Sequence, residues 1–189
     1  MADWNQFKEI TEALWKNYSP CEKGVSGFQI QTGTKWNNGL SIEKIKNLEV
    51  LFDIALPIEY KKMLIVINGF DRENVDFYEE EKQYFRSCYK YPDDWEVVQK
   101  FIAELYDHME TIKIVLKESK LAEKEIKGFI PLYSHRALVV FENLELTPVI
   151  SAIGDDIIIY GHSLIEYWIH EFKLEASVGC AKPGQPLHT

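Results

Sequence analysis

A histidine, an arginine and two carboxylates could perform acid–base chemistry together if two short polar segments of this chain converge. The segments are His135-Arg136 and Asp155-Asp156, and each separates two apolar runs, as a turn between strands does. In one interpretation His135 is a general base and Arg136 holds an anion. In the other, which we favour, an arginine–aspartate or a histidine–aspartate pair ties the two turns together, and Gly154-Asp155 forms a hairpin turn.

Other residue types that often carry chemistry are not arranged for it. The sequence contains no glycine-rich phosphate loop and no Gly-x-Ser-x-Gly nucleophile turn. The three cysteines, Cys21, Cys88 and Cys180, are widely spaced and odd in number, which favours reduced thiols. Arg86 and Lys90 flank Cys88 and could lower its pKa, although a lone cysteine is more often incidental. The remaining histidines show no metal-ligand spacing; they are His108, His162, His170 and His188. We therefore expect no catalytic residue, no metal and no cofactor.

Protein recognition is the favoured function, and the segment between residues 70 and 94 is the candidate surface. Aromatic side chains alternate there with carboxylates, a mixture that is unlike a buried core. Aromatic residues supply anchors at interfaces, and carboxylates steer toward a basic partner, where they could take the place of phosphates on a cationic nuclease. The predicted contact residues are Asp76, Phe77, Tyr78, Glu79, Glu80, Glu81 and Tyr84. The alternative is that these charges only form a solvated face.

The chain as a whole is acidic, with 189 residues, a net charge of −9 and a pI of about 5.1. This charge argues against direct binding of nucleic acid, because phosphate contacts need clustered lysine and arginine. Apolar runs reach only about five residues where a membrane span needs about 20, and the first residues lack the features of a signal peptide. We expect a cytoplasmic protein, a monomer or weak homodimer, whose charged partner is basic.

The sequence also predicts several helices. A short helix from Pro57 to Ile67 should close at Asn68-Gly69, where left-handed backbone is tolerated. An apolar stripe at spacings of three and four predicts one continuous helix of about six turns over residues 95–116. Such a stripe usually faces a core, and a helix–helix dimer seam is the alternative. The residues that can cap other helices are Asp3, Ser41 and Ser163.

The last third of the chain predicts strands instead. Four short apolar runs cover residues 129–132, 137–141, 148–153 and 157–160, and the last two should form a hairpin. Earlier in the chain, Trp36-Asn-Asn-Gly39 is expected to be a turn. The full pattern predicts a single domain over residues 1–176, followed by a loose tail over 177–189.

Two separated blocks of the sequence resemble the SMI1/KNR4 family of the SUKH superfamily. The first runs from Leu56-Pro-Ile-Glu-Tyr60 to Asn68-Gly69. The second runs from Gly128-Phe-Ile-Pro-Leu132 to Ser163-Leu-Ile-Glu-Tyr-Trp168 and includes Asp156-Ile-Ile-Ile-Tyr160. The order and spacing of the blocks carry the resemblance. The segments 70–94 and 95–116, which separate the blocks, depart from the compact family pattern.

The resemblance implies an α+β fold with a curved, mostly antiparallel sheet and helices packed on one face. Many bacterial members are immunity proteins that bind and neutralise toxins, often nucleases, whereas fungal members are regulators linked to cell-wall glucan synthesis. No catalytic residues carry over. The expected function is therefore a non-enzymatic immunity protein that neutralises a bacterial toxin by direct binding. A regulatory adaptor of the same family type is the first alternative. A small-molecule enzyme that uses His135, Arg136, Asp155 and Asp156 is the second.

Overall fold

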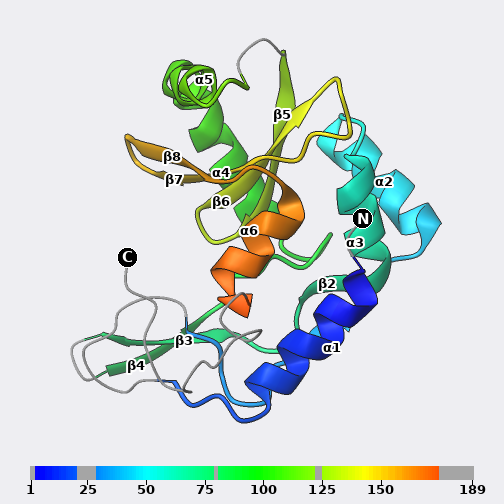
Figure 1. Cartoon of the computed structure of the whole chain (residues 1–189), viewed down its shortest axis with the longest axis vertical. Coiled ribbons are helices and arrows are strands. Elements are labelled where there is room, and N and C mark those ends of the chain that lie inside the picture. Colours follow the sequence, from blue (N-terminus) through cyan, green and yellow to red (C-terminus); the bar gives the residue numbers. More distant parts are fainter. Residues whose placement is uncertain (1–2, 21–28, 79–80, 122–124, 175–189) are drawn as a thin grey trace.

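The computed structural model describes residues 3–20, 29–78, 81–121 and 125–174, so the predicted tail at 177–189 lies outside the described residues. Helices and antiparallel strands combine in an α+β fold (Figure 1). The helices are α1 (Trp4–Trp15), α2 (Ile42–Phe52), α3 (Ile58–Val66), α4 (Trp95–Asp107), α5 (Met109–Glu118) and α6 (Leu164–Glu171). The strands are β1 (Trp36–Asn38), β2 (Ile67–Phe70), β3 (Asn74–Tyr78), β4 (Glu81–Phe85), β5 (Ile126–Tyr133), β6 (Arg136–Phe141), β7 (Val149–Ile153) and β8 (Asp156–Gly161).

The last third of the described chain forms a four-stranded antiparallel sheet in the order β5-β6-β7-β8. Each strand adjoins the next one in sequence, and all four predicted strands are confirmed. Ile153 pairs with Asp156 across the turn between β7 and β8, and Gly154 takes a φ of 55° there. A glycine reaches this left-handed region without steric cost, so the predicted hairpin is confirmed.

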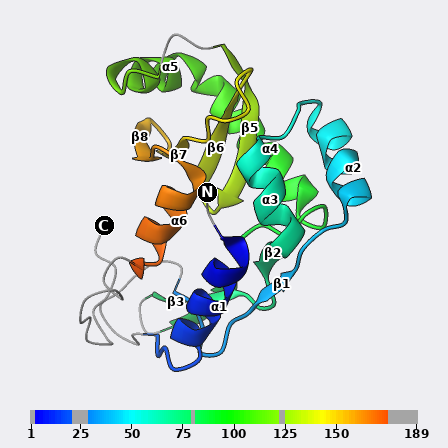
Figure 2. The same cartoon turned by 45° about the vertical axis from the view of Figure 1, so that its right-hand side comes forward.

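Helices cover both faces of this sheet, which corrects the expected single covered face (Figure 2). Leu138 and Val140 of β6 point to one side, where they join a first core together with α6. Ala137, Val139 and Phe141 point to the other side, where they join a second core together with α4 and α5. A strand covered on both faces is apolar at successive positions, which explains the uninterrupted apolar run in β6.

Aromatic rings from distant parts of the chain fill much of the first core. The Trp36 ring lies 4.6 Å from Phe70 and 5.6 Å from Trp168, measured between ring centroids. Trp168 in turn stacks on Phe172 at 5.4 Å, and Trp15 of α1 meets the edge of Phe172 at 5.0 Å. These rings bury large apolar areas, so they hold α1, β1, β2 and α6 together.

The predicted helix over residues 95–116 is wrong in one respect, because the chain breaks it at His108. That residue leaves the helical conformation with φ −97° and ψ 16°, and it separates α4 from α5. The apolar stripe itself is buried as expected, but its members serve two cores: Val98 joins the first, and Leu105 and Ile112 join the second. The break lets α4 pack on β5 while α5 packs on β8.

The exit from α3 also differs from the prediction. The helix ends at Val66, and Ile67 is already extended, so Asn68 and Gly69 belong to strand β2 instead of closing the helix. The Asn68 side chain explains this choice. Its amide donates to the Tyr91 carbonyl at 2.7 Å and accepts from the Tyr91 N–H at 3.0 Å, as a neighbouring strand would. Strand β2 pairs with β1, so the turn predicted at Trp36 is also wrong.

The predicted helix starts are confirmed by their hydrogen bonds. The side chain of Ser41 accepts from the Lys44 N–H at 3.3 Å, and Ser163 accepts from the Glu166 N–H at 3.3 Å. Asp3 accepts from two N–H groups of the first turn of α1. Each bond satisfies a donor that the helix itself leaves unpaired.

Candidate functional site

Arg136, the predicted cation of the polar cluster, is buried at the start of β6 on the α6 side of the sheet. Its Nε lies 3.7 Å from Oε2 of Glu171, and its guanidinium carbon lies 4.2 Å from the centroid of the Tyr160 ring. Both side chains of the ion pair are about nine-tenths buried. Sequence reasoning missed Glu171, because nothing in the sequence indicates that α6 lies over β6.

The buried pair is incompletely hydrogen-bonded. Within the described residues, Nε and Nη1 of Arg136 and Oε2 of Glu171 have no hydrogen-bond partner, and the same holds for the Tyr167 hydroxyl and the Trp168 indole N–H. Burial raises the pKa of Glu171, and the Arg136 charge acts in the opposite direction. Arg136 and Glu171 therefore attract each other between sheet and helix without a hydrogen bond between Nε and Oε2.

The predicted carboxylates take other positions. Asp155 is almost fully exposed in the turn between β7 and β8, where its Oδ1 lies 3.5 Å from Nδ1 of His108 at the break between α4 and α5. Asp156 is also exposed and begins β8. Arg136 and Asp155 thus have different partners, and the arginine–aspartate pair expected between the two turns does not form.

His135 lies half-buried in the turn between β5 and β6. Its backbone carbonyl accepts from the Ala152 N–H at 2.9 Å, which joins this turn to β7. Burial, and then the nearby Arg136 charge, lower the pKa of His135 to about 4. The imidazole is therefore neutral at pH 7 and a weaker base than an ordinary histidine.

This pKa predicts that His135 makes stability fall with decreasing pH. An unfolded histidine has a pKa of about 6.5, so between that pH and about 4 the unfolded chain binds a proton that the folded chain does not. We expect the urea midpoint of the native protein to drop more between pH 7 and pH 4.5 than that of His135→Gln, which cannot take up this proton. Equal drops in the two proteins would contradict the assignment.

The β3–β4 hairpin, which contains the predicted contact residues, forms a two-stranded sheet of its own (Figure 1). Its base is anchored in the fold. The buried Asn74 amide donates to the Tyr133 hydroxyl at 2.9 Å, and Asn74 also bonds to Ser87. Val75 exchanges backbone hydrogen bonds of 2.9 Å in both directions with Gln29. The hairpin is thus held at its base, while all of β4 up to Tyr84 is exposed.

The register of the hairpin divides the predicted contact residues between its two faces. Phe77 pairs with Lys82, and Tyr84 lies two positions further along β4, so these three side chains share one face. Asp76 and Glu81 lie on the opposite face. Glu79 and Glu80 fall outside the described residues, and only the backbone of Tyr78, which pairs with Glu81, is described. The predicted contact residues are therefore divided between two surfaces, and Phe85, which pairs with Asn74, lies on the same side as Asp76 and Glu81.

Lys82 is a site residue that sequence reasoning missed. Its Nζ lies 5.5 Å from the centroid of Phe77 and 5.3 Å from that of Tyr84, within reach of a cation–π interaction with each ring. The lysine partly occupies the aromatic face and makes it locally cationic. The acidic face, with Asp76 and Glu81, is thus the side that suits a basic partner.

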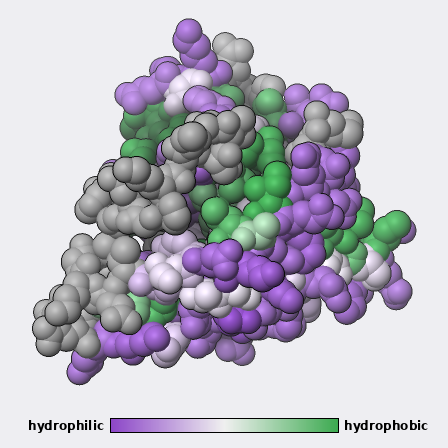
Figure 3. All heavy atoms as spheres, turned by 60° about the horizontal axis from the view of Figure 1, so that its bottom comes forward, coloured by the Kyte–Doolittle hydropathy of each residue, from purple (hydrophilic) through white to green (hydrophobic). Residues whose placement is uncertain are grey.

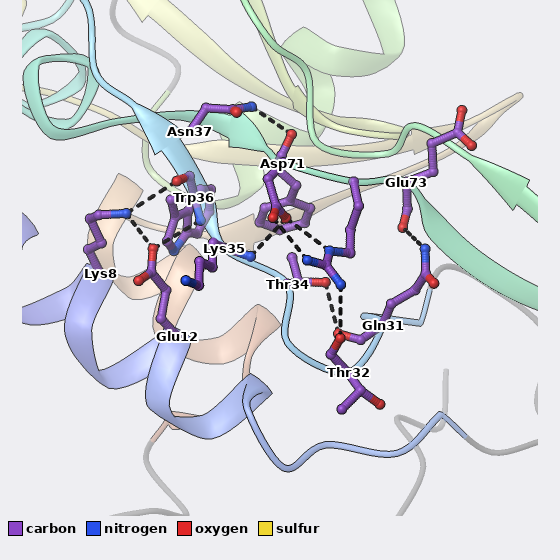
Figure 4. A network of polar contacts seen from close by, with 12 residues as sticks. Lys8, Glu12, Gln31, Thr32, Thr34, Lys35, Trp36, Asn37, Asp71 and Glu73 are labelled. Carbon is purple, nitrogen blue, oxygen red and sulfur yellow. Dashed lines mark hydrogen bonds and ion pairs between the residues drawn. The ribbon is translucent and has the colours of Figure 1, made fainter.

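A polar network holds the segment that leads into the hairpin (Figure 4). The Trp36 N–H donates to Glu12 of α1 at 3.0 Å, and the Lys35 N–H donates to Asp71 at 2.9 Å. Gln31 donates to the Glu73 carbonyl at 2.7 Å, immediately before β3. Asp71, though part of the acidic segment, is therefore committed to the fold, where Arg72 also donates to it.

Cys88 is an unreactive thiol in this structure. It is buried, and burial, reinforced by the Asp94 charge, raises its pKa well above the ordinary value. It borders a cavity with room for about one water molecule, which Tyr60, Asn68 and Trp168 also line. The possibility that Arg86 and Lys90 activate this thiol is therefore wrong.

Exposed apolar side chains occur on several elements. Ile42 and Val50 of α2 are 68% and 80% exposed, and hydrophobic residues accordingly appear at the right-hand edge of Figure 3, where α2 lies. On the sheet, Ile153 and Ile158 are 58% and 48% exposed. Single exposed apolar residues are ordinary, so each needs a second observation before it indicates an interface.

Comparison with models of protein families and with curated proteins produced no match. In the described part of the chain, no three histidine, cysteine or acidic side chains cluster as metal ligands would. No helix among the described residues has the length and apolar character needed to cross a membrane.

Proposed function

We propose that this protein is a non-enzymatic binding module whose β3–β4 hairpin receives a partner protein with a basic surface. The observation that carries the proposal is the acidic face of the hairpin, which presents Asp76 and Glu81 at diagonal positions of its two strands above an anchored base. A rigid base lowers the entropy lost on binding. The net charge of −9 adds long-range attraction for a cationic partner.

We further propose that the partner is a bacterial toxin and that the protein acts as a cytoplasmic immunity protein of the SUKH type. In support, the two blocks that carry the family resemblance supply α3–β2 and β5–β8–α6, and they pack together in the first core, where Leu56 and Tyr60 join Leu132 and Trp168. The hairpin, α4 and α5 separate the two blocks in sequence. The blocks nevertheless pack together as one unit. A nuclease is the favoured toxin class, because nucleases bind phosphates through cationic sites that carboxylates can fill.

The proposal predicts tight, salt-sensitive binding to a toxin encoded by the adjacent gene. The recombinant toxin would be titrated with the full chain by calorimetry at 50 and at 300 mM NaCl. We expect affinity to fall as salt rises, because screening weakens attraction between exposed charges. Glu81→Lys should weaken binding at least about tenfold at low salt, because it places like charges together.

A matched control separates a local contact from a change in net charge. Glu145→Lys alters the charge by the same amount in an exposed loop between β6 and β7, away from the hairpin (Figure 1). It should reduce affinity by no more than about twofold, through long-range steering alone. If Glu81→Lys binds the toxin as tightly as the native protein does, the hairpin is not the binding surface. The regulatory adaptor would be favoured over the immunity protein by two results together. These are the absence of a toxin gene beside this one and the failure of this protein to protect cells from the product of any neighbouring gene.

A further inference from the structure

The free edge of the four-stranded sheet is strand β8. Strand β7 is its only strand neighbour within the described residues, whereas the segment around residues 87–89 covers part of the opposite edge strand, β5. Lysine and proline, which block strand pairing, are missing from β8, and its charged residue Asp156 and its bulge at Tyr160 leave Ile157, Ile158 and Ile159 between them. An unprotected apolar edge is a template for another strand.

The hydrogen bonds of β7 show which groups of β8 point outward. The Ala152 N–H donates to the His135 carbonyl, so the backbone groups of Ala152 face away from β8. Its partner Ile157 is therefore not hydrogen-bonded to β7 and directs its own N–H and carbonyl toward the free edge. Ile159, two residues on, does the same. No hydrogen bond to these outward groups was found within the described residues.

We propose that β8 pairs antiparallel with β8 of a second copy of this chain, so that two sheets join across a twofold axis at Ile158. In this register Ile157 and Ile159 of one copy form hydrogen-bonded pairs with Ile159 and Ile157 of the other, giving about four backbone bonds. Ile158 then lies directly opposite its own symmetry mate, in the pair type whose side chains approach most closely. The Ile158 side chain is 48% exposed, and such a contact would bury it.

The side chains of β8 suit those of a second copy in this arrangement. Asp156 of one copy lies opposite Tyr160 of the other, whose hydroxyl can donate to the carboxylate. The two Asp156 carboxylates lie at opposite ends of the paired strands, about 13 Å apart at the rise of an extended chain. A parallel pairing in register would instead place like charges together. The interface is short, so we expect a weak homodimer that dissociates in the micromolar range.

Salt distinguishes this contact from binding of a basic partner. Each copy carries a net charge of −9, so the copies repel and added salt should favour their association. The full chain would be examined by sedimentation velocity from about 5 to 200 µM at 50 and 500 mM NaCl. We expect a concentration-dependent dimer that is stronger at high salt. Monomer under all conditions would overturn the proposal and leave the edge to a foreign strand or to residues 175–189.

Variants at the axis test the register. Ile158→Lys sets two cations against each other and should raise the dimer dissociation constant at least tenfold. Val50→Lys makes the same chemical change on α2, across the molecule from β8 (Figures 1 and 2), and should leave the constant unchanged. A dimer that survives Ile158→Lys would contradict the proposed axis.

A covalent trap gives an independent positive result. Ile158→Cys should form a disulfide with its symmetry mate under oxidised glutathione, because α-carbons in this pair type lie about 4.5 Å apart, within disulfide range. Two thiols lose two protons and two electrons to glutathione disulfide, which is reduced to two glutathione molecules. The unmodified chain and Val50→Cys control for the natural cysteines. Equal cross-linking of all three proteins would contradict the register.

Discussion

Gly39→Ala is expected to destabilise the protein by at least about 3 kcal/mol, among the largest effects of any single substitution. A methyl group at this position would overlap the backbone carbonyl of Ile65 and lie 2.6 Å from the Leu64 oxygen. Both are main-chain atoms near the end of α3, so no side-chain rotation can relieve the clash. The Leu64 oxygen also accepts from the Leu40 N–H at 2.7 Å, which fixes the close approach.

The measurement is urea unfolding, with Gly154→Ala as the matched control. A methyl group on Gly154 meets nothing within 4 Å, and only its φ of 55° opposes alanine. That conformation costs an L-residue about 1 to 2 kcal/mol. Gly39→Ala should therefore be clearly the less stable variant, in unfolding midpoint and in soluble yield. A smaller loss for Gly39→Ala than for Gly154→Ala would show that the end of α3 can move away.

Removing either member of the Arg136–Glu171 pair is expected to cost about 3 kcal/mol at pH 7, because the remaining charge stays buried without a partner. Replacing both with leucine should restore stability to within about 1 kcal/mol of the native protein. The double variant removes both buried charges. It also removes the buried donors of Arg136 and the buried acceptor of Glu171 that lack hydrogen-bond partners. A double-mutant cycle by urea unfolding measures the coupling.

The pH dependence of Arg136→Leu identifies the stranded group. Burial raises the pKa of Glu171, and loss of the arginine removes the charge that opposes this shift. A carboxyl with a raised folded pKa binds its proton in the folded state first, so stability is regained as pH falls through that pKa. We expect the deficit of Arg136→Leu to shrink from pH 7 to pH 5, whereas that of Glu171→Leu should not. If the stability losses of the two variants change with pH in the same way, the loss in Arg136→Leu comes from lost packing against Tyr160 instead.

The sequence was informative wherever local chemistry decides the structure. Ser41 and Ser163 cap helices as predicted, and Gly154 forms the turn of the predicted hairpin, because each acts on its immediate neighbours. The continuous apolar run of β6 is typical of a strand covered on both faces, whereas the resemblance implied one covered face.

Long-range contacts account for what could not be predicted. The apolar stripe continues evenly through His108, so only the positions of β5 and β8 reveal that the helix must break there. Asn68 resembles a helix stop until Tyr91 is known to lie beside it. Composition singles out the segment between residues 70 and 94, but the hairpin within it and the division of its faces depend on pairings such as that of Phe77 with Lys82.

The two cores on either side of the sheet differ in how they draw on the chain. The described residues of the second core all come from the stretch between Phe101 and Ile159. Those of the first extend from Trp4 to Leu174. During synthesis, the second core has all of these residues once Ile159 has emerged, whereas the first must wait for α6 and Leu174. The sheet thus joins an early core, closed by short loops, to a late core that ties the two ends of the fold together.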